Sequence, residues 1–205
     1  MPYIMVVDKV TVEAPGVKTL RLRFQNEEEG KEFEFLAGNF AEYSAFGEGE
    51  CTFCIASAPT RKGYVECTFR KAGRVTSGLD RLEEGMTMGF RAPLGNHFPL
   101  DDWKGKNLVF VAGGIALPPM RAVIDNVLDR REEFGDVTII YGAKTVNDLV
   151  YKEELKEWEE RPDVNLFVTV DPGGETPDWK GKVGFTPNVL GEVAPKSDNA
   201  IAIVC

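Results

Sequence analysis

The chain has 205 residues, 43% of them hydrophobic and 28% charged, which is enough for two packed domains of about 100 residues each. Its net charge is −9 and no basic cluster offsets it, so binding to nucleic acid or to an anionic membrane surface is not expected. The sequence shows no secretory signal and no apolar run long enough for membrane insertion, so we expect a cytoplasmic protein.

Residues 3–103 carry the alternation of apolar and polar side chains that is typical of β-strands. Phe33 and Phe35 continue this alternation, and one helical turn is expected at residues 75–82. Glycine-bearing turns separate the short strands, which predicts an antiparallel β-barrel domain over residues 1–103. The expected strands lie at residues 5–12, 20–24, 40–46, 52–56, 64–70 and 86–91.

From about residue 104 the pattern changes, because strand-like runs now alternate with helical ones. Such alternation predicts an α/β domain over residues 104–205, with a parallel sheet and helices on both of its faces. The boundary between the domains is expected within residues 101–106. The expected strands lie at residues 108–112, 137–141, 166–170 and 200–204, and the expected helices at residues 120–131, 146–160 and 186–193.

A glycine turn follows the first strand of this α/β domain. Gly113 and Gly114 come directly after the apolar run at residues 108–112, and Pro118 and Pro119 suit the first turn of the helix that follows. A strand, a glycine turn and a helix N-terminus together favour an anion site, usually for phosphate. The other interpretation is an ordinary turn between a strand and a helix.

The four cysteines are expected to be free thiols. Cys51 and Cys54 have the Cys-x-x-Cys spacing, but residues three apart on a strand face opposite ways, and no second such pair completes a metal site. His97 is the only histidine and is expected to be an exposed loop residue. No metal is therefore predicted, although a thiol or metal redox role for Cys51 and Cys54 remains an alternative.

Eight short segments, taken in order, resemble the ferredoxin–NADP reductase superfamily. The similarity is closest to the flavoprotein (gamma or B) subunits of sulfhydrogenase and anaerobic sulfite reductase type, and the electron-transfer subunit of dihydroorotate dehydrogenase is a further relative. The segments lie at residues 35–40 (FLAGNF), 52–58 (TFCIASA), 73–77 (GRVTS), 92–98 (APLGNHF), 112–116 (AGGIA), 141–144 (YGAK), 179–184 (WKGKVG) and 203–205 (IVC).

In this family the segment at residues 51–57 lies along the flavin, and its usual pattern is Arg-x-Tyr-Ser. This chain has Cys-Thr-Phe-Cys there, so the resemblance implies that the Phe53 ring stacks on FAD. The family's arginine pairs with an FAD phosphate, and Arg70 or Arg74 would have to supply that charge. The other interpretation makes Phe53 and Ile55 part of the barrel core.

Residues 73–77 match the turn that binds the FAD pyrophosphate in the family, and the other interpretation is a helix N-cap by Thr76 or Ser77. Residues 95–98 resemble the segment beside the flavin. The resemblance assigns to FAD binding Phe53, Cys54, Ile55, Ala56, Ser57, Phe69, Arg70, Gly73, Val75, Thr76, Ser77, Gly95 and Asn96.

The resemblance also assigns the nicotinamide cofactor to the carboxyl ends of the parallel strands. Asp171 favours NADH because a carboxylate repels the 2′-phosphate of NADPH. Lys144 argues the other way, since its cation could pair with that phosphate. The other interpretation of Asp171 is that it only forms a turn. The assigned residues are Gly113, Gly114, Ile115, Ala116, Gly142, Lys144 and Asp171.

Cys205 matches the family's catalytic cysteine, which faces the contact between flavin and nicotinamide. The other interpretation is a small apolar residue that ends a core strand. The printed sequence ends at this position, where the family continues with a glycine-proline turn and a helix. The closer relatives add a cysteine-rich iron–sulfur segment, so the α/β domain is expected to be truncated at its C-terminal end.

The function implied is that of an FAD-dependent NAD(P)H oxidoreductase subunit. It would transfer hydride between nicotinamide and FAD and exchange electrons with a partner subunit or a ferredoxin-like iron–sulfur carrier. One alternative is an assembly module that binds flavin and nucleotide without turnover, and another is the thiol or metal redox protein.

Overall fold

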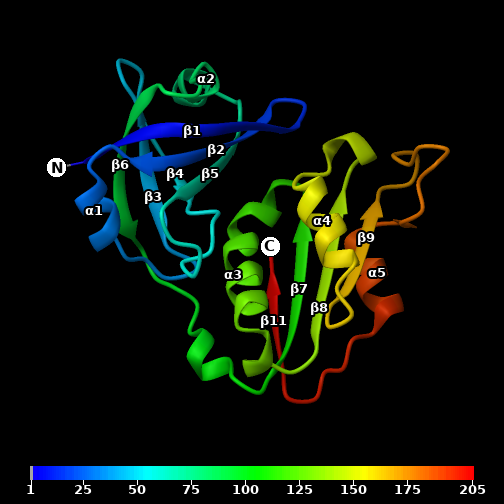
Figure 1. Cartoon of the computed structure of the whole chain (residues 1–205). Coiled ribbons are helices and arrows are strands. Elements are labelled where there is room, and N and C mark those ends of the chain that lie inside the picture. Colours follow the sequence, from blue (N-terminus) through cyan, green and yellow to red (C-terminus); the bar gives the residue numbers. More distant parts are fainter. Residues whose placement is uncertain (1) are drawn as a thin grey trace. The chain divides into compact units, whose positions relative to one another are not determined.

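The computed structural model describes residues 2–205, which divide into two compact units (Figure 1). The first unit contains the described residues as far as Val12, together with Gly16–Phe98 and Arg121–Asp129. The second contains Glu13–Pro15, Pro99–Met120 and Arg130–Cys205. Each unit is built around one sheet.

The first unit holds a six-stranded sheet, in which the ladders β1–β6, β2–β5, β3–β4 and β3–β6 are antiparallel. The strand order is β4-β3-β6-β1-β2-β5, which confirms the predicted antiparallel N-terminal architecture. The strands are β1 (Tyr3–Ala14), β2 (Val17–Phe24), β3 (Phe40–Ala45), β4 (Gly49–Cys54), β5 (Val65–Arg70) and β6 (Thr87–Leu94).

The expected closure of this sheet into a barrel is not found, because no ladder joins the two edge strands β4 and β5 within residues 2–205. Just beyond β4, the Ala56 N–H donates to the Glu66 carbonyl at 2.8 Å. This bond brings the chain after β4 against β5 without extending the ladder.

The alternation around Phe33 and Phe35 does not mark a strand, and that prediction is wrong. A helix, α1 (Glu27–Glu32), precedes these two residues instead. Asn26 caps it by accepting the Glu28 N–H at 3.1 Å, and three glutamates in its first turn complement the helix dipole. Phe33 and Phe35 follow in an irregular segment whose rings, 5.7 Å apart, pack on the core. The helical turn expected at residues 75–82 is α2 (Arg74–Asp80).

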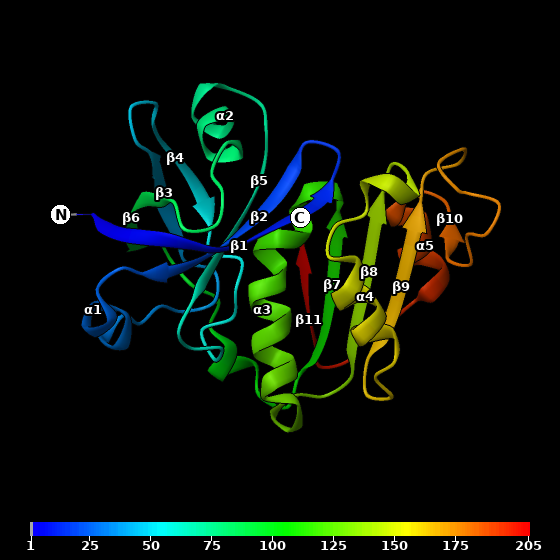
Figure 2. The ribbon, with the colours of Figure 1, turned by 45° about the horizontal axis from the view of Figure 1, so that its top comes forward.

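The second unit holds a five-stranded sheet in the order β10-β9-β8-β7-β11, with all its ladders parallel. Its four longer strands lie where the sequence predicts them, and α4 and α5 cover opposite faces of the sheet (Figure 2). The elements are β7 (Asn107–Gly113), β8 (Val137–Ala143), β9 (Asn165–Val170), β10 (Lys182–Val183), β11 (Ala200–Val204), α4 (Lys152–Glu159) and α5 (Thr186–Val193). Helix α3 (Leu117–Asp129) begins in this unit, and its residues Arg121–Asp129 belong to the first.

The helix expected over residues 146–160 is shorter in the structure because the backbone leaves the α-helical conformation before residue 152. Val146–Asp148 forms a separate 3-10 turn, and Tyr151 adopts a left-handed conformation with φ of 56°, which an α-helix does not accommodate. The helix α4 therefore begins only at Lys152. Helix α3 begins earlier than predicted, at Leu117, so that Pro118 and Pro119 both lie in its first turn.

None of the helices within residues 2–205 combines the length and the apolar character that crossing a bilayer requires.

Candidate functional site

The segment after β4 is largely part of the core of the first unit. Ile55, Ala56 and Ser57 are each 1% exposed, and the N–H groups of Ile55 and Ala56 donate to the carbonyls of Asn39 and Glu66. Phe53 is half-buried, and its ring lies 6.0 Å from the ring of buried Phe69 and 6.3 Å from that of Tyr43. The Phe53 ring therefore packs against two other aromatic rings, and part of its surface stays accessible to solvent.

The cysteines near this segment are poor candidates for thiol chemistry. Burial, together with the charge of Glu42, raises the pKa of Cys51 to about 11, so its thiol stays protonated at neutral pH. Burial also raises the pKa of Cys67 well above its ordinary value. Across residues 2–205, no group of three or more histidine, cysteine or acidic side chains is placed to hold a metal ion. These observations weigh against a redox role for Cys51 and Cys54.

The turn at residues 73–77 opens helix α2. Thr76 Oγ1 accepts the N–H groups of Ala72 and Gly73 at 2.9 and 2.8 Å, so Thr76 organises the turn as a cap residue would. The Ser77 N–H donates to the Gly73 carbonyl, and Val75 is half-buried. A Cβ at Gly73 would have no neighbour within 4 Å, so open space lies over the turn.

The two arginines proposed to replace the family's arginine differ in their partners. Arg74 binds the carboxylate of Glu48 at 2.8 Å and the carbonyl of Gly47 at 3.1 Å. Arg70, at the end of β5, is exposed and forms no ion pair with the residues that the structure describes. The cation of Arg70 is therefore the one available to an anionic ligand.

Asn39 is a positioning residue that the sequence interpretation missed. Its amide nitrogen donates to the carbonyls of Leu94, Gly95 and Asn96 at 3.2–3.3 Å, and its side-chain oxygen accepts the Leu36 N–H at 2.8 Å. Its own carbonyl accepts the Ile55 N–H. Asn39, which is 7% exposed, thus ties residues 94–96 and the backbone of Ile55 to its own segment.

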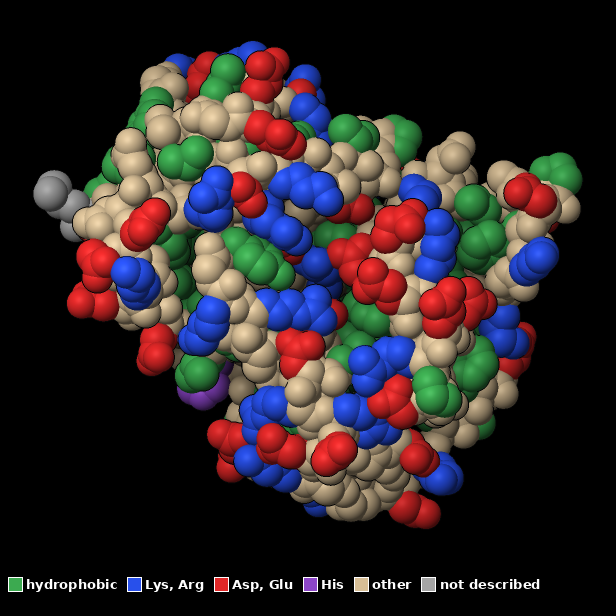
Figure 3. Space-filling model, in the orientation of Figure 1, with side chains coloured by type: hydrophobic (Ala, Val, Ile, Leu, Met, Phe, Trp, Pro, Cys, Tyr) green, Lys and Arg blue, Asp and Glu red, His purple; other side chains and the backbone are tan. Residues whose placement is uncertain are grey.

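Gly95 follows β6 with φ of +75°, and a Cβ there would meet the Phe40 ring at 2.3 Å. The close approach of this ring explains why glycine occupies the position. Asn96 and His97 are exposed, and His97 is the one histidine visible at the surface in Figure 3.

In the second unit, the carboxyl ends of neighbouring strands bring several predicted residues together. Gly113 of β7 pairs with Gly142 of β8, and Asp171 follows β9, where its N–H donates to the Ala143 carbonyl at 3.1 Å. On the other side of β7, the Gly113 N–H donates to the carbonyl of Cys205 at 3.1 Å. Gly113, Gly142 and the exposed Cys205 therefore share one edge of the sheet.

The glycine turn after β7 presents backbone to open space. Neither Gly113 nor Gly114 has a heavy atom within 4 Å of an added Cβ, and Gly114 has φ of +56°. Ile115 and Ala116 complete the turn that leads into α3. The buried Tyr141 hydroxyl donates to the Gly114 carbonyl and accepts the Val150 N–H, both at 3.2 Å. Tyr141 therefore holds the turn in place, a role that periodicity alone did not reveal.

Asp171 and Lys144 lie on neighbouring loops of this edge. The Gly174 N–H donates to the Asp171 carbonyl at 2.8 Å, so the backbone of Asp171 does form a turn. Lys144 is exposed, and within the described chain neither side chain takes part in an ion pair. Both charges are therefore open to a ligand.

Known proteins resemble this chain in sequence and in fold. Residues 110–205 match the model of the oxidoreductase NAD-binding domain family. The chain is 32% identical over 188 residues to the gamma subunit of sulfhydrogenase 1 from Pyrococcus furiosus, covering 92% of this chain and 64% of that protein. The gamma subunit of sulfhydrogenase 2 from the same organism is 33% identical over 67% of this chain and 47% of its own. The chain thus spans less than two thirds of either relative.

Solved structures show the same fold over the whole chain at lower identity. Amycolatopsis cytochrome P450 reductase GcoB has a TM-score of 0.82 and 22% identity over 100% of this chain and 61% of its own. A ferredoxin NADP+ reductase from Neisseria gonorrhoeae has a TM-score of 0.77 and 16% identity over 98% of this chain and 84% of its own. The chain has the ferredoxin–NADP reductase-like fold, and its residues 110–205 are similar to the oxidoreductase NAD-binding domain family.

Proposed function

We propose that this chain is the flavin- and nicotinamide-binding part of an FAD-dependent NAD(P)H oxidoreductase. One observation carries the proposal: an open glycine turn, Gly113–Gly114, lies at the carboxyl edge of a parallel sheet within the segment that matches NAD-binding domains. Ligands of open α/β sheets bind at this edge, and backbone N–H groups at a helix start suit a pyrophosphate.

The residues of the first unit fit a flavin nucleotide in chemical type. Phe53 offers a supported aromatic surface, Arg70 an uncommitted cation, and Gly73 a turn with open space above it. An aromatic surface suits an isoalloxazine ring, and a cation beside an open turn suits a pyrophosphate. FAD is therefore the group that we assign to these residues.

When both cofactors are bound, they supply the reaction itself, a hydride transfer between nicotinamide and flavin. The chain binds and orients them: Phe53 would support one ring and the Gly113–Gly114 turn would fix the other nucleotide. Asn39 and Tyr141 hold these segments through buried hydrogen bonds, and Cys205 lies next to Gly113. The exposed His97 has no part in this scheme.

We further propose that electrons pass to or from a partner subunit or a ferredoxin-like iron–sulfur protein. The support is similarity to two proteins named as sulfhydrogenase subunits, since a subunit works within a larger assembly. An assembly module without turnover is the second candidate. Purified protein that contains flavin and loses its flavin absorbance with NADH would support the enzyme, whereas flavin-containing protein that NADH leaves oxidised would favour the module.

Arg70 and Arg74 give a matched pair of variants for the flavin assignment. We expect Arg70→Ala to weaken FAD binding about tenfold, because a charge-assisted bond to phosphate is lost. Arg74→Ala should change FAD affinity little, since Glu48 already binds that guanidinium. Fluorescence titration of the apoprotein with FAD measures both, and equal losses would remove Arg70 from the site.

Asp171 is expected to set the choice between NADH and NADPH. The parent should prefer NADH, and Asp171→Ser should raise kcat/KM for NADPH about tenfold relative to NADH, because the repulsion of the 2′-phosphate is removed. Lys144→Ala in the Asp171→Ser background should reverse part of that gain. Steady-state dye reduction with each cofactor measures the ratio, and an unchanged ratio in Asp171→Ser would contradict this role.

A further inference from the structure

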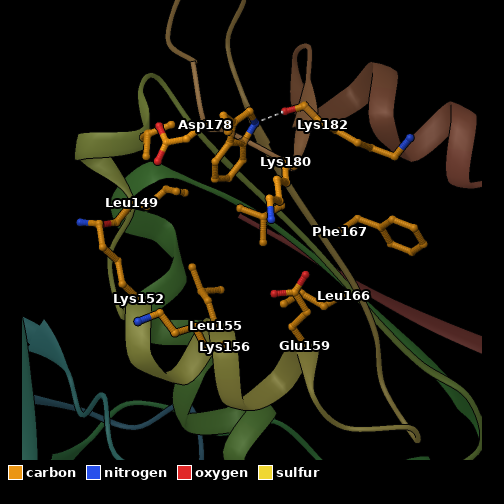
Figure 4. Close-up of a pocket in the computed structure, with 14 residues that line it drawn as sticks. Leu149, Lys152, Leu155, Lys156, Glu159, Leu166, Phe167, Asp178, Lys180 and Lys182 are labelled. Carbon is orange, nitrogen blue, oxygen red and sulfur yellow. Dashed lines mark hydrogen bonds between the residues drawn. The ribbon is translucent and has the colours of Figure 1, made fainter. Parts of the chain in front are cut away.

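A groove of about 570 Å³ runs along the sheet of the second unit, between α4, strand β9 and the segment Asp178–Lys182 (Figure 4). Its lining contains neither the glycine turn of β7 nor Lys144 or Asp171, so it is separate from the edge assigned to the nicotinamide cofactor. The volume is in the range of small-molecule sites.

The groove exists because the sheet is only partly covered at this side. Strand β10 is two residues long and pairs only with Thr169 and Val170, so the earlier part of β9 pairs with β8 on one side and has no strand on the other. Helix α4 faces this part of β9 with residues spaced three and four apart, so that Leu155 lies between Lys152 and Glu159 on one side of the helix. The floor of the groove is therefore apolar.

Two opposite charges point into this apolar groove from different walls. Figure 4 shows the amino group of Lys180 and the carboxylate of Glu159 directed toward its centre. Neither side chain forms an ion pair anywhere in residues 2–205, so the two groups are more than 4.0 Å apart. Space for a ligand thus lies between a cation and an anion.

The other lysines that line the groove are directed away from it (Figure 4). Lys156 binds Glu153 at 2.9 Å, Lys182 binds Glu192 at 3.0 Å, and Lys152 donates to the Leu149 carbonyl at 2.7 Å. Trp179 donates its indole N–H to the Lys182 carbonyl, so it offers the groove its ring surface. Lys180 is the one lysine of this lining that is available to a ligand.

We propose that the groove binds a short apolar peptide with both ends charged, its carboxylate at Lys180 and its ammonium at Glu159. Charges on opposite walls suit a ligand with its own charges at two ends, as in a dipeptide, better than one that carries both on a single carbon. Leu155, Leu166 and Trp179 would cover the apolar side chains. A polyanion is disfavoured because Glu159 and Asp178 both line the groove.

Calorimetric titration of the full chain with leucyl-leucine tests the proposal. The dipeptide should bind about tenfold more tightly than N-acetyl-leucyl-leucine, which lacks the ammonium, and than leucyl-leucine amide, which lacks the carboxylate. Free leucine should also bind more weakly. Absence of binding by the dipeptide, or equal binding by the acetylated analogue, would overturn the proposal.

Variants of the two charges give an independent check. Lys180→Met and Glu159→Gln should each weaken dipeptide binding about tenfold, whereas Lys156→Met, which alters a lysine directed away from the groove, should not. The double exchange Lys180→Glu with Glu159→Lys should restore binding with the peptide reversed. All three side chains are exposed, so we expect each variant to fold as the parent does. Equal loss in Lys156→Met, or dimerisation that depends on Lys180, would contradict the proposal.

Discussion

Replacing Arg121 by methionine should lower the free energy of unfolding by about 3–5 kcal/mol, the usual effect of leaving a buried charge without its partner. Arg121 and Glu66 are each only 4% exposed, and the Arg121 guanidinium binds the Glu66 carboxylate and donates to the Ala56 carbonyl at 3.3 Å. Arg21 binds the other oxygen of Glu66 at 2.9 Å. Without Arg121, Glu66 would keep one partially exposed partner in an apolar surrounding.

The same ion pair extends into a chain of alternating charges in the first unit. Asp125 lies 3.7 Å from Arg121 Nε and binds Arg61 at 2.8 Å, and Arg61 also binds Asp129. These bonds hold the loop that follows the candidate flavin segment against residues 121–129. We therefore expect Arg121→Met to loosen that loop as well as to destabilise the unit.

The double variant Arg121→Met with Glu66→Gln is the control for charge as opposed to packing. It should regain most of the lost stability, because it removes the uncompensated carboxylate as well. Chemical denaturation of the parent, both single variants and the double variant measures the coupling. Additive losses would show that Arg121 acts through packing alone.

The folding stability contributed by Glu66 should depend on pH with opposite signs in the parent and in Arg121→Met. Burial raises the pKa of Glu66, but Arg121 and then Arg21 outweigh it, so the pKa in the parent lies below its ordinary value. The contribution of Glu66 to stability is thus present above its unfolded pKa, about 4.3, and is lost as the pH falls through the lower folded value. In Arg121→Met, burial without that partner should raise the pKa, so protonation should stabilise the variant. The difference in unfolding free energy between the parent and Arg121→Met should therefore become smaller toward about pH 4–5.

Gly113→Val should lower kcat/KM for NADH about 100-fold while leaving flavin reduction by dithionite unchanged. Gly113 has φ of −119° and ψ of 125°, an extended conformation that valine adopts easily, and its added Cβ would touch no heavy atom within 4 Å. The substitution therefore fills only the space in which we place the nicotinamide nucleotide. At Gly114, by contrast, φ of +56° would add backbone strain and confuse the result.

Gly191→Ala in α5 is the matched control, since a Cβ there also meets no neighbour within 4 Å but lies on a helix outside the strand ends. Gly191→Ala should leave flavin reduction by NADH and by dithionite unchanged. If Gly113→Val keeps the parental kcat/KM, the nucleotide does not lie over this turn. If dithionite reduction is lost as well, the substitution has damaged the fold.

The strands were predictable because each shows either an alternation of apolar and polar residues or a continuous apolar run within a few residues. The four longer strands of the second unit were found where alternation or continuous apolar runs placed them, and β11 agrees with its prediction residue for residue. Aromatic residues misled the same reasoning at Phe33 and Phe35, where they pack on the core from an irregular segment. The start of α4 depended on the left-handed Tyr151, which no hydrophobic pattern records.

The sequence predicted that Gly113 and Gly142 follow neighbouring parallel strands, and the structure pairs them, while their role in binding a nucleotide stays a prediction. Asn39, Tyr141 and Arg121 were missed because each acts on carbonyls or carboxylates that are distant in the sequence. A single sequence gives the residue type of such a group but not its partner. A buried polar residue within an apolar segment, such as Asn39, is the signal that points to roles of this kind.

Anaerobic titration of the flavin-loaded protein with NADH tests the central claim most directly. We expect the flavin absorbance band to disappear with one equivalent of NADH per flavin, since each hydride carries two electrons, and to return in air. A flavin that dithionite bleaches but NADH leaves oxidised, in protein that binds NADH, would contradict the claim that this chain is an NAD(P)H oxidoreductase.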